Sequence, residues 1–173
     1  MQPVKVTIES DMLCYCMPQP GDVVYQKLTF NQNGQVWFSK DVQPDLNAPP
    51  EKPHTIRSKI DSTTAQGLLK DIYNSITVHG QRRYATDIGS WKVTLNLSNG
   101  LTLGDEGTPG CEQRLTCVTD KLRKLLPELD IEAFGHSYDD DFIDIKVGTE
   151  VYNTTFGYGV IKYFIEDTVR ISF

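Results

Sequence analysis

The chain has 173 residues and a mass of 19.5 kDa, which suits one domain or two small units. Apolar residues make up 39% of it and aromatic residues 10%, enough for a packed core, so the composition excludes disorder as the main state. It has 17 basic and 23 acidic residues, and its net charge is −6. A general nucleic-acid binder carries the opposite charge, and we therefore do not expect direct binding to nucleic acid.

The sequence also bears on location. No run of residues approaches the roughly 18 apolar residues that a membrane span needs. Residues 1–10 lack the basic head and apolar stretch of a secretory signal peptide. We therefore expect a cytoplasmic protein that does not associate with membranes.

Four cysteines are present, and a reducing compartment would keep them as thiols. Cys14 and Cys16 lie in strand-like sequence, and Cys111 and Cys117 are six residues apart. Neither pair has the spacing of a zinc knuckle, so we interpret all four as small, mostly buried hydrophobic residues and expect no cofactor. A four-thiolate zinc site is the alternative.

The first part of the chain predicts a strand and a hairpin. Residues 4–9 alternate between apolar and polar types, which is typical of a half-buried strand. Residues 23–30 are rich in β-branched and aromatic types, and a return strand begins at Val36. Between them, Asn33-Gly34 supplies the positive φ angles that a tight turn requires.

A loop and a helix follow the hairpin. Residues 42–55 contain four prolines, which lack the backbone N–H of a ladder or helix. The spacing of apolar residues predicts a helix over 62–77, capped by Asp61 or Ser62.

The same order of elements recurs. Residues 91–97 alternate cleanly, Asn99-Gly100 predicts a second tight turn, and residues 101–103 begin a return strand. A second amphipathic helix is predicted over 112–126, ended by Pro127.

These patterns predict an α+β fold, in which two hairpin-helix units build one antiparallel sheet with both helices on one face. The residues that we expect in a shared core lie on the apolar faces of these elements: Trp37, Leu69, Ile72, Trp91, Leu95, Val118 and Leu122.

The tail has a different composition. Residues 128–150 hold eight acidic residues and one lysine, so this segment carries −7 and the rest of the chain +1. Three short strands are predicted after it, at 149–152, 159–165 and 168–173. The sequence thus predicts an α+β domain over 1–127, an acidic connector over 128–147, and a small β-meander over 148–173 that packs on the main sheet or completes it.

Two stretches of the sequence resemble known protein families. The tail resembles the Tudor-like or SH3-like barrels at the ends of some bacterial helicases, through Gly148, Val151, Phe156, Gly157, Gly159, Val160, Val169 and Phe173. The strand start at Asp87, Gly89, Ser90 and Trp91, followed by an Asx-Gly turn, resembles a recurring domain of uncharacterised proteins from Gram-positive bacteria and phages. This second resemblance implies a bacterial or phage-borne setting and no known activity.

The sequence shows no catalytic motif. It has no G-x-S-x-G, and nothing in the spacing pairs one of its three histidines with a cysteine. As a calcium loop, the run from Asp139 fails, because Ile143 takes a ligand position and Asp144 stands where glycine is needed. We expect a protein that is not an enzyme and holds no metal.

The remaining interpretation is a docking surface. Its expected acidic and aromatic contact residues are Tyr138, Asp139, Asp140, Asp141, Phe142 and Asp144, with Phe156, Tyr158 and Tyr163 in the tail. Such a surface suits a protein partner with basic charge, and the hypothesis is an inhibitor of a nuclease or other nucleic-acid-handling enzyme, by analogy with anti-CRISPR and anti-restriction proteins. The alternatives are an adaptor that contacts nucleic acid or polymerase through the Tudor-like tail, and a small enzyme or zinc protein that uses the cysteines.

Overall fold

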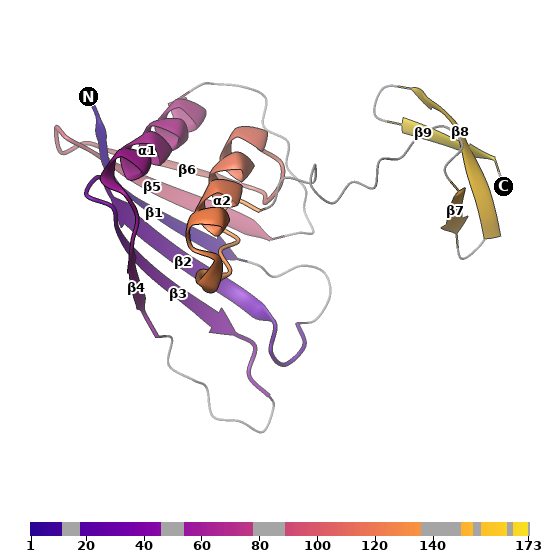
Figure 1. The fold of residues 1–173 in the computed structure, drawn as a ribbon, viewed down its shortest axis with the longest axis horizontal. Coiled ribbons are helices and arrows are strands. Elements are labelled where there is room, and N and C mark those ends of the chain that lie inside the picture. The colour runs from indigo at the N-terminus through magenta and orange to yellow at the C-terminus, as the bar shows by residue number, and fades with distance from the viewer. Residues whose placement is uncertain are drawn as a thin grey trace. The chain divides into compact units, whose positions relative to one another are not determined.

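The structure is a computed structural model that describes residues 1–11, 18–45, 54–77, 89–135, 150–153, 157–165 and 168–172. It divides into two units, Met1–Ser137 and Tyr138–Phe173, and each is described by itself (Figure 1).

The first unit is built on a six-stranded antiparallel sheet in the order β4-β3-β2-β1-β5-β6. The two predicted hairpins meet on the N-terminal strand, which pairs with β2 on one side and β5 on the other. The short edge strand β4 was not predicted, because only one of its four residues, Ile56, is apolar and four residues give no alternating pattern. The strand bounds are β1 Pro3–Asp11, β2 Val23–Asn31, β3 Gln35–Val42, β4 Ile56–Lys59, β5 Ser90–Leu97 and β6 Thr102–Gly107.

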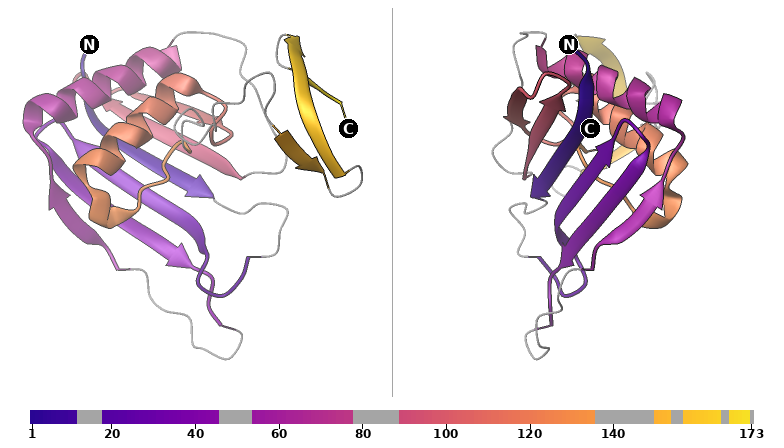
Figure 2. Two further views of the ribbon diagram at one scale, coloured as in Figure 1. Left: turned by 45° about the vertical axis from the view of Figure 1, so that its right-hand side comes forward. Right: turned by 90° about the vertical axis from the view of Figure 1, so that its left-hand side faces the viewer.

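Both helices cover one face of this sheet, as predicted (Figure 2). Helix α1 spans Ser62–Thr77, and α2 spans Gln113–Leu125 and is followed by the 3₁₀ turn η1, Pro127–Leu129. The Asp61 carboxylate caps α1 by accepting a hydrogen bond from the Thr64 N–H at 2.9 Å. Among the described residues, no helix is long and apolar enough to cross a membrane.

The core lies between the sheet and the helices and contains six of the seven residues expected there. The prediction for Trp37 is wrong: it is half-buried, whereas its neighbours Val36 and Phe38 are buried. Successive strand residues point to opposite faces, so either Trp37 or the pair Val36 and Phe38 can face the helices. The register decides which, because Val36 and Phe38 lie opposite the buried Phe30 and Leu28.

The predicted boundary at residue 127 is also wrong. Leu129, Ile131, Ala133 and Phe134 are buried in the core of the first unit. The first residues of the predicted acidic connector therefore belong to the α+β unit, and acidic residues alternate with apolar ones that pack inward.

The second unit contains a three-stranded antiparallel sheet in the order β7-β8-β9. Its strands are Glu150–Asn153, Gly157–Ile165 and Thr168–Ser172, close to the three that were predicted. They form a sheet of their own, and the Tudor-like or SH3-like barrel stays a prediction.

Candidate functional site

Most of the predicted docking residues lie outside the described residues: Tyr138, Asp139, Asp140, Asp141, Phe142, Asp144 and Phe156. Tyr158 and Tyr163 lie on β8. The side chain of Tyr158 is 79% exposed, which is unusual for a large aromatic residue on a strand. Within residues 128–150, the structure describes residues 128–135 and Glu150 on β7, and Glu128 and Asp130 are exposed.

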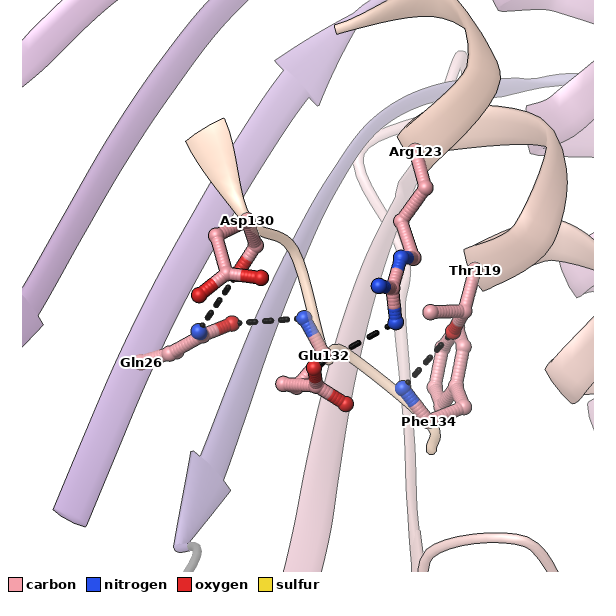
Figure 3. Close-up of polar contacts among 6 residues, drawn as sticks. All are labelled: Gln26, Thr119, Arg123, Asp130, Glu132 and Phe134. Atoms are coloured by element: carbon pink, nitrogen blue, oxygen red, sulfur yellow. Dashed lines mark hydrogen bonds and ion pairs between the residues drawn. The ribbon is translucent and has the colours of Figure 1, made fainter. Parts of the chain in front are cut away.

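Residues 130–135, which we call the docked segment, are held against the rest of the first unit by a buried glutamine (Figure 3). Gln26 of β2 donates through Nε2 to the Asp130 carbonyl oxygen at 2.9 Å, and its Oε1 accepts from the Glu132 N–H at 2.8 Å. The side chain is only 2% exposed. One buried amide thus satisfies two backbone groups of a chain segment that belongs to no strand.

Further contacts hold the rest of the docked segment. The Phe134 N–H donates to Thr119 Oγ1 of α2 at 3.0 Å, and Arg123 pairs with Glu132 at 3.4 Å (Figure 3). The Phe134 ring meets the Trp91 ring edge-to-face, with centroids 5.2 Å apart. The docked segment is therefore joined to β2, β5 and α2 at once.

The backbone of the docked segment is unusual at two residues. Asp130 has a φ of 49° and Ala133 a φ of 23°, both in the region that side chains disfavour. Gly135 follows with a φ of 84°, and a Cβ there would lie 2.5 Å from the Gly110 nitrogen. These bends bring the chain to a fixed position at residue 135, four residues before the first aspartate of the acidic run.

The second feature of interest is the sheet face opposite the helices, which we call the open face (Figure 2). Register places at most one residue from each strand in rows that cross the sheet. The threonine row consists of Arg57, Trp37, Thr29, Thr7, Thr94 and Gly104. Its side chains are short except at the β4 end, and Thr7 and Thr29 are joined by a hydroxyl hydrogen bond of 3.1 Å.

A more polar row lies on each side of the threonine row. The amide row consists of Lys59, Gln35, Asn31, Lys5, Asn96 and Thr102, and the Asn31 side chain donates to Gln35 Oε1 at 2.8 Å. The charged row consists of Ser39, Lys27, Glu9, Lys92 and Glu106. Cations and acids therefore alternate in the charged row, whereas the amide row has no acid.

In and beside the charged row, the electrostatic effects act between neighbouring side chains. Lys27 Nζ lies 2.8 Å from Glu9 Oε1, and this hydrogen bond lowers the pKa of the Glu9 carboxyl. Burial, together with a hydrogen bond to Glu9, raises the pKa of the Tyr25 hydroxyl to about 12. Lys27 and Glu9 of this row therefore satisfy one another.

The open face was missed from the sequence, although the alternation that predicts each strand also assigns one residue in two to this side. Which residues share a row depends on strand order. The strand order brings Lys5 of β1 between Asn31 and Asn96, which are 65 residues apart.

The described cysteines correct one expectation. Cys117 is exposed on α2 and Cys111 is half-buried, so these two are not the buried residues that we expected. Cys14 and Cys16 lie outside the described residues. Within the described ranges, no three histidine, cysteine or acidic side chains come together as a metal site would require.

The resemblances named above stay predictions, since they rest on short stretches of sequence. Compared with protein-family models and with curated proteins, the chain finds no match in either.

Proposed function

We propose that this chain is a non-catalytic binding protein whose acidic segment docks on a protein with a basic surface. The observation that carries the proposal is the uneven charge: residues 128–150 hold −7 and the rest of the chain +1. Charge concentrated in this way attracts a basic partner over a Debye length, about 8 Å at physiological salt. This long-range attraction raises the association rate of the two proteins more than it strengthens their individual contacts.

The docked segment supports this proposal. The acidic run begins at Asp139, four residues after Gly135, and residues 130–135 are held by Gln26 and Thr119. A segment that leaves its domain from a fixed point explores less space than one on a free linker. Binding then costs less conformational entropy, which raises affinity.

The partner that suits this segment is an enzyme with a nucleic-acid channel. Duplex DNA has one charge per roughly 1.7 Å of its axis, and such channels are built to receive dense negative charge. Asp139, Asp140, Asp141 and Asp144 supply four carboxylates within six residues. Tyr138 and Phe142 add aromatic groups of the kind that dominate protein interfaces.

The test reverses the acidic run and measures inhibition. A variant with all four of these aspartates replaced by lysine is compared with wild type in DNA cleavage by a panel of purified bacterial nucleases, at low and high salt. Wild type should slow cleavage by at least one nuclease at low salt, and the variant should not. A pair of reversals, Asp139→Lys with Asp140→Lys, is matched by Asp41→Lys with Asp45→Lys, which changes the net charge equally elsewhere. If the four-lysine variant inhibits as well as wild type, the proposal is wrong.

A second candidate function rests on the exposed Tyr158. It is 79% exposed on β8, and Lys162 on the same strand is also exposed. An aromatic ring and a cation on one strand suit an adaptor that contacts nucleic acid or polymerase through the tail. Under this alternative, Tyr158→Ala removes partner binding and the aspartate reversals do not.

A further inference from the structure

The half of the open face nearest the β2–β3 turn has a charge that differs from that of the whole chain. The threonine row and the amide row together hold Lys5, Arg57 and Lys59, and none of their twelve described positions carries an acid. The charged row beside them holds two lysines and two glutamates, and Lys27 is bound to Glu9 at 2.8 Å. The net charge of −6 therefore does not describe this surface.

The same two rows carry groups that recognise bases. Trp37 is half-buried in the threonine row, with Arg57 opposite it on β4 and Thr29 opposite it on β2. An aromatic ring on a sheet can stack with a base, which is worth about 1–3 kcal/mol per base. The amides of Gln35 and Asn96 and the threonine hydroxyls offer donors and acceptors to base edges. The Asn31 amide instead holds the β2–β3 turn, because its Oδ1 accepts from the Asn33 and Gln35 N–H groups.

From these observations we propose that the open face binds a single strand of nucleic acid, laid across the strands along the threonine row. Neighbouring strands are about 4.8 Å apart, so six strands span about 24 Å, which suits a site of a few nucleotides. Lys5, Arg57 and Lys59 bind phosphates, and Trp37 stacks with one base. This binding is additional to the proposed docking function and uses no residue of the acidic segment.

A single strand fits better than the other polyanions. In a duplex, the faces of the bases are already stacked, so a ring such as Trp37 that is set among sheet side chains has no base face to meet. An acidic peptide would satisfy the three cations, but it offers no base for Trp37 and no base edges for the amides. Trp37 and the amide row therefore favour a single strand.

The first experiment measures binding of the full chain to a fluorescein-labelled dT12 oligonucleotide by anisotropy at several salt concentrations. A variant that carries Lys5→Gln, Arg57→Gln and Lys59→Gln should bind more weakly. Its slope of log affinity against log salt should fall by about 2, since each phosphate contact on a single strand contributes about 0.7. The matched control carries Lys70→Gln, Arg114→Gln and Lys124→Gln, the same charge change on the exposed parts of the helices. The control should keep the wild-type slope, and equal slopes for both triple variants would overturn the proposal.

The second experiment uses tryptophan fluorescence. The chain has two tryptophans, and Trp91 is only 1% exposed, so quenching by the oligonucleotide reports on Trp37. Trp37→Leu should weaken dT12 binding about 5- to 150-fold, the equivalent of losing one stacked base. Trp37→Phe, which keeps a ring, should lose less. Both variants should retain the buried fluorescence of Trp91, which shows that they are folded.

Three results would overturn the proposal. One is a failure of dT12 to bind at low salt, and another is binding without quenching of Trp37. The third is equal competition by a twelve-residue polyglutamate peptide, because it would mean that the face recognises charge alone.

Discussion

Replacing Gln26 by leucine should destabilise the first unit, because the docked segment depends on this buried amide. The substitution removes two hydrogen bonds and leaves the Glu132 N–H and the Asp130 carbonyl without their partner. A lost hydrogen bond contributes about 1 kcal/mol, and leaving a partly buried group unsatisfied adds about 1–3 kcal/mol. Part of this loss is offset by the extra apolar surface of leucine. We expect a net loss of about 2–4 kcal/mol.

Urea unfolding followed by tryptophan fluorescence measures this loss. Trp37 and Trp91 both lie in the first unit, so the signal does not include the second unit. Thermal unfolding should show a decrease in Tm of roughly 5–10 °C, since a domain of this size loses about 2–4 °C per kcal/mol. Gln66→Leu is the control, because Gln66 is exposed on α1, and it should change stability by less than about 0.5 kcal/mol.

The isosteric variant Gln26→Glu tests the same two hydrogen bonds through their dependence on pH. A protonated glutamate can donate to the Asp130 carbonyl and accept from the Glu132 N–H, as the amide does. Burial should raise the pKa of this carboxyl in the folded state. The variant should therefore be near wild-type stability at pH 4 and should lose stability as the pH rises through the raised folded pKa. A loss below about 0.5 kcal/mol for Gln26→Leu, or a pH-independent Gln26→Glu, would refute the role given to this side chain.

Three further predictions concern the core and helix α1. Trp91→Ala should cost about 3–5 kcal/mol in urea unfolding followed by circular dichroism, because it empties a large buried site; a loss below 1 kcal/mol would contradict its place in the core. Gly67→Ala should stabilise by up to about 1 kcal/mol, because nothing lies within 4 Å of the added Cβ; a lower Tm would contradict this. Asp61→Ala should lower the Tm at pH 7, whereas Asp61→Asn keeps a capping group. The Thr64 N–H lowers the pKa of Asp61, so the charge-dependent stabilisation exists above the unfolded pKa and is lost as the pH falls through the folded pKa. The Asp61→Ala deficit should therefore shrink in acid, and an unchanged deficit at low pH would argue against the carboxylate cap.

Local patterns predicted the helices and hairpins well. The predicted bounds of the first helix, 62–77, are those of α1, because the cap at Asp61 and the repeat of Ala65, Leu69 and Ile72 all report the same helix. The two Asn-Gly turns also lie between the strands that they were expected to join. In these cases one short segment contains all the information that decides its structure.

Trp37 shows where local pattern was insufficient. Val36, Trp37 and Phe38 are all apolar, so alternation alone does not say which side faces the helices. The answer depends on pairing with Leu28 and Phe30 across the hairpin. A one-residue error in register assigns every side chain of a strand to the wrong face. For β3, this error put Trp37 in the expected core, whereas it lies on the open face.

The boundary at 127 failed for a different reason. In residues 128–133, acidic residues alternate with Leu129, Ile131 and Ala133, and this period of two indicates that one side of the segment is buried. The segment was interpreted by its charge, and the period of two in its apolar residues was not used. The open face could not be predicted from the sequence, because the strand order decides which residues share it. The acidic run was predicted, but it lies outside the described residues.

The position of β1 has a consequence for how the protein is made. β1 is first in the chain, yet it lies inside the sheet, and its partner Val93 follows Ile8 by 85 residues. On the ribosome, β1 to β3 can pair early as a meander, but the opposite edge of β1 stays open until β5 emerges. The docked segment comes later still, so Trp91 lacks its Phe134 neighbour until nearly the whole unit has been synthesised. A nascent chain halted before residue 134 should therefore expose a sheet edge and an unfinished core, and should depend on chaperones more than the finished protein does.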